Sequence, residues 1–338
     1  MFVEQITLPL ADDLHVHLRQ DHLMQTVVPL IDKGGAGRVL VMPNLKPHIK
    51  TTKQALNYQQ ALKALNPRVE YLMTLYLNPE LTIEEIQKAA TAKIIGIKSY
   101  PRGVTTNSED GIENYEIYYA LFAEMEKLGL ILNLHGEVPS NAEKNICILN
   151  AEENFLQHLE KIHKNFPKLK IVLEHITTKA AVEKVEELGL TVSATITPHH
   201  LDLTVDDWAG QNHNYCKPVA KYPSDRAALR AVIKSGNPKF FLGSDSAPHL
   251  RSAKENSCAC AGIFTTPLLL PYLADTFEKL NCLNKLKDFC CTFGREFYGL
   301  SALEQTITLK KISQKIPAEY NHIVPYRAED ELQWRIID

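Results

Sequence analysis

The sequence predicts an α/β fold, a (β/α)8 TIM barrel with a short C-terminal extension. Eight short apolar runs alternate with longer amphipathic stretches, which favours a barrel of parallel strands and covering helices. Runs such as 39–42 and 171–173 are apolar without alternation, as expected of strands buried on both faces of a sheet. No Gly-x-Gly-x-x-Gly follows the first run, so an open dinucleotide-binding sheet is disfavoured.

Each expected strand is a short apolar run that ends in a polar turn. In chain order the expected strands lie near residues 11–17, 37–43, 69–77, 93–99, 129–135, 169–175, 190–197 and 238–245. Expected helices occupy 52–65, 81–91, 114–128, 150–165, 179–188 and 224–235. In the third of these, Leu121, Met125 and Leu128 fall at helical spacing, and Gly129 follows as a C-terminal stop. Two further segments, 263–278 and 284–297, precede a polar tail.

The chain has no feature that divides it into domains. Its 338 residues suit one large barrel, and no internal repeat, low-complexity segment or Gly/Ser-rich linker interrupts them. We therefore expect one metal-dependent hydrolase barrel domain over residues 1–338.

Composition and charge exclude several classes of partner. The net charge is −3 without long runs of like charge, so we expect no nucleic-acid and no membrane partner, and a small-molecule substrate instead. No apolar run reaches about 18 residues, and the N-terminus lacks a basic region before an apolar core, which favours a cytoplasmic protein. Seven cysteines, two pairs of them closely spaced, indicate reduced thiols.

The first strand carries the most specific motif, Asp13-Leu14-His15-Val16-His17-Leu18-Arg19. Alternate residues of a strand share a face, so His15 and His17 can reach one metal ion. Two histidines on one face can also be ordinary hydrogen-bonded residues, and the motif alone does not decide between these roles.

Polar residues at the ends of the other strands strengthen the metal interpretation, because the active site of a barrel lies at the C-terminal ends of its strands. The fourth strand ends in Lys98, and the residues that end or follow the other strands include Asn44, His135, His175, His199, His200 and Asp245. Four imidazoles and one carboxylate at one mouth form a donor set suited to Zn2+. Lys98 could be a snorkelling lysine, a substrate-binding charge, or a carbamate that bridges two zinc ions.

Motifs in the same order along the chain resemble those of the amidohydrolase superfamily, and more closely those of the bacterial dihydroorotases made of a barrel alone. The matching segments are 13–19, Met42-Pro43-Asn44-Leu45, 97–101, Val104-Thr105-Thr106-Asn107, Leu134-His135-Gly136-Glu137, 174–178, 195–200, 243–249 and Cys258-Ala259-Cys260-Ala261-Gly262. They cover most of the chain.

The resemblance implies a binuclear zinc centre. His15, His17 and Asp245 would hold one ion, His135 and His175 the other, and N6-carboxylated Lys98 would bridge both. The implied reaction is the reversible ring closure of N-carbamoyl-L-aspartate to L-dihydroorotate in pyrimidine biosynthesis. Asp245 would be the catalytic residue that shuttles a proton between water and the ring nitrogen.

The resemblance also implies the residues that contact substrate. Arg19, Asn44 and His249 would hold its carboxylate, and backbone groups near Lys217 and Ala261 would contact the ring. Thr105 and Thr106 match the tip of a loop that closes over substrate, and the family favours a homodimer. The chain departs from the family at Leu14, where an aromatic residue is frequent, and at Lys217, where an apolar residue is common. The roles of His199 and His200 stay open, and neither is placed in the site.

Three alternatives remain. A hydantoinase or allantoinase would have the same metal centre and a neutral substrate, but the residues expected to hold a carboxylate argue against it. His135-Gly136-Glu137 is similar to the His-x-Glu unit of purine deaminases, although Lys98 has no role in such an enzyme. A catalytically inactive barrel could serve as a scaffold, yet every expected ligand is present.

Overall fold

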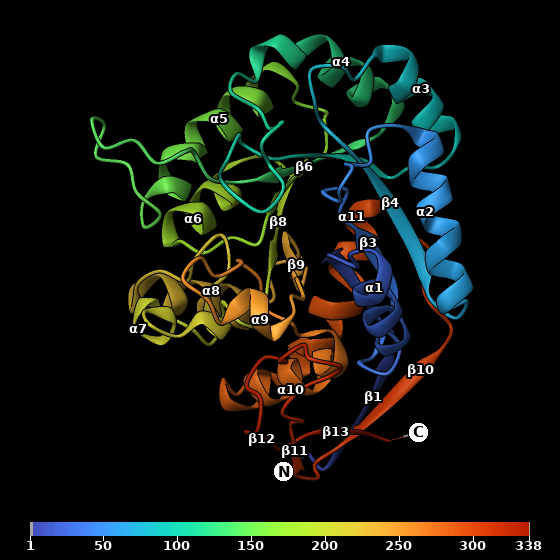
Figure 1. Ribbon diagram of the computed structural model, residues 1–338, viewed down its shortest axis with the longest axis vertical. Helices are drawn as coiled ribbons and strands as arrows, with labels where there is room; N and C mark the ends of the chain where they lie inside the picture. The colour runs from blue at the N-terminus through green and yellow to red at the C-terminus, as the bar shows by residue number, and fades with distance from the viewer. Residues whose placement is uncertain (1–2, 338) are drawn as a thin grey trace.

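Eight parallel strands form a nearly closed barrel, as the sequence predicted (Figure 1). The computed structural model describes residues 3–337. The barrel strands are β2 (Ala11–Val16), β3 (Ala36–Val41), β4 (Glu70–Tyr76), β5 (Gly96–Ser99), β6 (Ile131–His135), β7 (Ile171–Glu174), β8 (Val192–Ile196) and β9 (Phe240–Leu242). The Asp245 backbone N–H donates to the His15 carbonyl (2.9 Å), so the chain after β9 joins the end of β2.

Helices lie between consecutive strands and cover the outside of the barrel (Figure 1). Those expected from the sequence are α2 (Thr52–Leu65), α3 (Ile83–Thr91), α4 (Tyr119–Leu128), α5 (Ala151–Asn165), α6 (Lys179–Glu187) and α8 (Pro223–Ser235). Gly129 ends α4 in the left-handed conformation (φ 74°), as its position predicted. Short helices that the sequence analysis missed are α1 (Asp21–Val27), α7 (Val205–Trp208) and α9 (Arg251–Lys254). Each has too few residues to show a hydrophobic period.

The chain after the last barrel strand is more ordered than expected. The two predicted segments contain α10 (Leu269–Lys279) and α11 (Phe293–Tyr298), but the expected polar tail also forms strands. β10 (Thr306–Lys310) pairs with the N-terminal strand β1 (Gln5–Pro9) and with β13 (Arg335–Ile337), and β11 (Gln314–Lys315) pairs with β12 (Glu331–Leu332). These strands are short and partly exposed, so no apolar run marked them.

Apolar side chains close the barrel at the end opposite the strand C-termini. Leu14, Phe241 and Tyr298 belong to one buried cluster, and α11 packs so closely that a Cβ on Gly294 would meet the Leu14 side chain. No helix within residues 3–337 is both long and apolar enough to span a membrane.

Candidate metal centre

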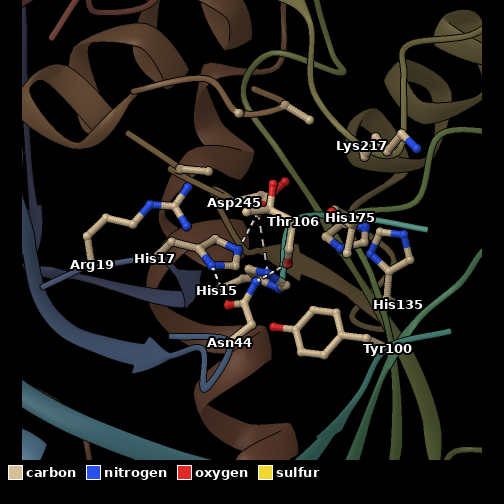
Figure 2. A pocket seen from close by; sticks show the side chains of 14 residues that line it. His15, His17, Arg19, Asn44, Tyr100, Thr106, His135, His175, Lys217 and Asp245 are labelled. Atoms are coloured by element: carbon tan, nitrogen blue, oxygen red, sulfur yellow. Dashed lines mark hydrogen bonds and ion pairs between the residues drawn. The ribbon is translucent and has the colours of Figure 1, made fainter. Parts of the chain in front are cut away.

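The predicted ligands converge at the C-terminal mouth of the barrel (Figure 2). Strand β2 supplies His15, His17 follows directly after it, and the segment after β9 supplies Asp245. Asp245 Oδ1 lies 3.0 Å from His17 Nε2 and 3.4 Å from His15 Nε2, and all three side chains are buried. One ligand atom from each lies within 4.8 Å of the others, so these residues could hold a metal ion.

The other two histidines adjoin this group. The His175 ring centroid lies 4.9 Å from that of His15 and 4.7 Å from that of His135. The four imidazoles therefore form one continuous wall. Burial lowers the pKa of His17 to about 4 and lowers those of His135 and His175 as well, which favours the neutral form that ligates metals.

Lys98 is buried beneath these rings. Its Nζ has no hydrogen-bond partner within residues 3–337, and it lies 5.0 Å from the centre of the Tyr100 ring. Burial lowers the pKa of Lys98 to about 8, although the charges of Glu174 and Asp245 oppose that shift. Burying an unpaired ammonium costs free energy. A group that removes the charge of this amine, or that coordinates it, would therefore fit the site.

Two carboxylates that the sequence analysis did not assign orient the histidines. Glu174 Oε2 lies 2.8 Å from His15 Nδ1, and Glu137 Oε2 lies 2.8 Å from His135 Nε2. Asn44 Oδ1 does the same for His17 Nδ1, at 2.9 Å. Each acceptor favours a proton on the nitrogen it faces, which leaves the other ring nitrogen free for a metal. In the sequence, the one feature that could have identified Glu137 and Glu174 was that each lies within two positions of a predicted histidine ligand.

This proton arrangement places acceptor atoms opposite one another. The Nε2 lone pairs of His15 and His17 would face the Asp245 carboxylate, an arrangement that needs a cation between them. Burial would raise the pKa of Asp245, but with no cation bound a proton on His17 Nε2 and the charge of the nearby imidazoles outweigh burial and hold this pKa below its usual value. The donor set is therefore anionic and suits a divalent cation.

We expect Glu174→Gln to weaken metal binding about 10- to 100-fold, because an amide is a poorer acceptor and no longer fixes the His15 ring. The measurement is metal retained per chain in a competition with a chelator. Glu160→Gln, on the exposed face of α5, is the control and should bind metal like the unmodified chain. Equal retention by Glu174→Gln and the control would contradict the positioning role.

A positively charged wall lies beside the metal ligands. Arg19 Nε donates to the Pro248 carbonyl (3.0 Å), and its Nη2 lies 3.0 Å from His249 Nε2. His249 Nε2 also lies 3.0 Å from the Ala261 carbonyl. Burial and the charge of Arg19 lower the pKa of His249, so its ring is neutral. Arg19 therefore supplies the positive charge of this wall.

The segment 103–108 covers the opposite side. Asn44 Nδ2 donates to the Thr106 carbonyl (3.0 Å), and Lys217 Nζ donates to the Val104 carbonyl (2.6 Å). Figure 2 shows Arg19 and Lys217 on opposite sides of Asp245. All the predicted site residues except Lys98 and His249 line the resulting cavity, and Tyr100, Ala247 and Gly262, which were not predicted, line it too.

His199 and His200 are not among the residues of the range 3–337 that line this cavity. His200 Nδ1 lies 2.9 Å from Thr197 Oγ1, and its Nε2 lies 3.0 Å from the Pro218 carbonyl. Both nitrogens of His200 are thus engaged in holding the chain after β8. Glu137 does not line the cavity within residues 3–337 either, because its carboxylate lies behind His135, which disfavours the deaminase interpretation.

Comparisons with known proteins bear on the family and the fold of this chain. Residues 10–305 match the amidohydrolase family. The chain is 47% identical to the dihydroorotase of Mycosarcoma maydis, and the alignment covers 100% of both chains. The crystal structure of Saccharomyces cerevisiae dihydroorotase in complex with 5-fluoroorotic acid has a TM-score of 0.96 and 41% identity over 99% of each chain. The L-hydantoinase of Arthrobacter aurescens has a TM-score of 0.85 at 17% identity, covering 98% of this chain and 83% of that one, and shares the fold.

Proposed function

The chain belongs to the amidohydrolase family and within it to the dihydroorotases, and from this premise we propose that it interconverts N-carbamoyl-L-aspartate and L-dihydroorotate in pyrimidine biosynthesis. The observation that carries the proposal is the guanidinium of Arg19 on the wall of a cavity lined by His15, His17 and Asp245. Such a site combines a metal-ligand set with a group that grips a carboxylate.

We propose that two Zn2+ ions belong to this site, one held by His15, His17 and Asp245 and the other by His135 and His175. The unpartnered Lys98 amine and the facing acceptor atoms of the first group support this fit. Carboxylation of Lys98 joins its Nζ to the carbon of CO2 with loss of a proton, and gives an anion that can bridge both ions. When bound, the ions acidify water and polarise the amide carbonyl.

In this proposal Asp245 moves the proton. In ring opening its carboxylate accepts a proton from the attacking water and delivers it to the ring nitrogen as the carbon–nitrogen bond breaks. In ring closure the carboxylate accepts the proton of the attacking amide nitrogen and gives it to the departing hydroxide, which leaves as water. The contacts of Asp245 with His15 and His17 hold it at the centre of the site.

We propose that Arg19, Asn44 and His249 bind the substrate carboxylate. Asn44 Nδ2 has two protons, and only one is used by Thr106, so a donor remains for the substrate. Backbone groups of Lys217 and Ala261 would contact the ring, and Thr105 and Thr106 would cover it. A hydantoinase substrate without a carboxylate would leave the charge of the half-buried Arg19 unpaired, which argues for an anionic substrate.

The remaining proposals depend on the resemblance. We propose one hydrolase domain over residues 1–338, acting as a cytoplasmic homodimer. The family match over residues 10–305 supports the extent of the domain.

The function is tested by incubating the zinc-loaded chain separately with dihydroorotate and with carbamoyl aspartate. We expect each to be converted to the other, and about two zinc ions per chain. Hydantoin, allantoin and adenosine serve as comparison substrates. Faster turnover of any of these than of dihydroorotate would contradict the proposal.

A further inference from the structure

The cavity at the barrel mouth is enclosed by the segment 103–108. Its volume is about 20 Å³, which is room for about one water molecule and far less than a six-membered ring with a carboxylate needs. Thr105 and Thr106 belong to its lining. Substrate can therefore enter and leave only if this segment moves, and the contacts that hold it in place must break in each turnover.

Besides a long contact from the Tyr76 hydroxyl to the Asn107 carbonyl (3.5 Å), two sets of contacts hold the segment. The first set comes from Asn44. Its side chain donates to the Thr106 carbonyl, and its backbone carbonyl accepts a hydrogen bond from Asn107 Nδ2 at 2.8 Å. The second is the single bond from Lys217 Nζ to the Val104 carbonyl at 2.6 Å. Asn44 also orients His17, so its contacts are tied to the metal centre, whereas those of the Lys217 side chain are not.

Lys217 forms no ion pair among residues 3–337, and its ammonium donates instead to the Val104 carbonyl. A second cavity of about 260 Å³ adjoins this bond and is lined by Gly103, Val104, Glu137 and Lys217 among others. On that side the segment therefore borders a cavity, although the Val104 side chain itself is buried. A bond from a charged donor is stronger than a neutral one, so it can hold the segment beside this cavity.

We propose that the ammonium of Lys217 is a latch that holds the segment 103–108 over the site. This makes Lys217 a positioning residue through its side chain, in addition to the backbone contact proposed above. The apolar residue common in the family at this position cannot form this bond. The expected effect of the latch on turnover rests on the proposed function. The expected effect on the mobility of the segment does not, because it is measured without substrate.

The latch is tested by hydrogen exchange of the chain without substrate. Lys217→Met keeps the aliphatic length and removes the donor, so we expect exchange across residues 103–108 to become about tenfold faster. Lys217→Arg retains a charged donor and should restore slow exchange. Lys170→Met is the matched control, since Lys170 Nζ donates to the Phe297 carbonyl at 2.6 Å near the closed end of the barrel. It should leave exchange across 103–108 unchanged.

Kinetics give a second measurement. With the latch removed, closure over the substrate is less favourable, so we expect the KM for dihydroorotate to rise about tenfold in Lys217→Met and to recover in Lys217→Arg. Exchange across 103–108 that is the same in Lys217→Met and the unmodified chain would overturn the latch, whatever the activity. Faster exchange in Lys217→Met than in the unmodified chain, together with an unmodified chain that lacks dihydroorotase activity, would support the latch and contradict the proposed function.

Discussion

Lys98→Met is expected to lower kcat/KM for dihydroorotate by about 10³-fold or more and to reduce the metal content below two ions per chain. The side chain is fully buried and contacts no acceptor within residues 3–337, so its proposed role is to bridge the ions as a carbamate. Metal ions contribute several kcal/mol of charge stabilisation in the transition state, which corresponds to this factor. Steady-state kinetics and elemental analysis provide the measurements.

Methionine is the informative replacement because it fills the same space without an amine. Circular dichroism should show an unchanged fold, and Lys170→Met should retain two metal ions and full activity. Mass spectrometry of the unmodified chain under native conditions should detect one added carbon dioxide that is absent from Lys98→Met. A Lys98→Met chain that keeps both ions and more than a tenth of the activity would contradict the bridging role.

Arg19→Met should keep the metal ions and lose about 10²- to 10³-fold in kcat/KM. The guanidinium lies on the cavity wall, where hydrogen bonds to a substrate carboxylate are shielded from water and each contributes about 1.5–3 kcal/mol. The comparison substrate is dihydrouracil, which has the same ring without the carboxylate. We expect its slow turnover to be nearly equal in Arg19→Met and the unmodified chain.

This pair of substrates separates a carboxylate clamp from a structural role. Arg19 also donates to the Pro248 carbonyl, so a purely structural role would reduce turnover of both substrates alike. Unchanged activity of Arg19→Met toward dihydroorotate would refute the clamp.

The barrel and the candidate metal ligands were predictable from local patterns, whereas the other predicted lining residues were expected only from the family resemblance. The eight barrel strands are short apolar runs with a polar residue at or after the end, and a parallel barrel brings such ends to one mouth. His15, Lys98 and Asp245 could thus be grouped although they lie far apart in the chain. The pairing of β1 with β10 could not, because both strands are partly exposed and their partner lies about 300 residues away.

The backbone conformation at the site could not be predicted from the sequence either. Arg19 (φ 59°), His175 (φ 42°) and Asp245 (φ 47°) all adopt the left-handed conformation, which residues other than glycine rarely do. Surrounding contacts must hold this conformation, as the bond from the Asp245 N–H to the His15 carbonyl does. Local propensity carries no information about such contacts.

By itself the sequence determined the fold class and the identity of the candidate ligands, because hydrophobic period and strand alternation depend on near neighbours along the chain. Only the tertiary structure decided how each ligand is oriented and what closes the site. Glu174 against His15, and Lys217 against Val104, are contacts between segments more than 100 residues apart. Their formation depends on how the whole barrel packs, so the sequence pattern could supply the residues but not their pairing.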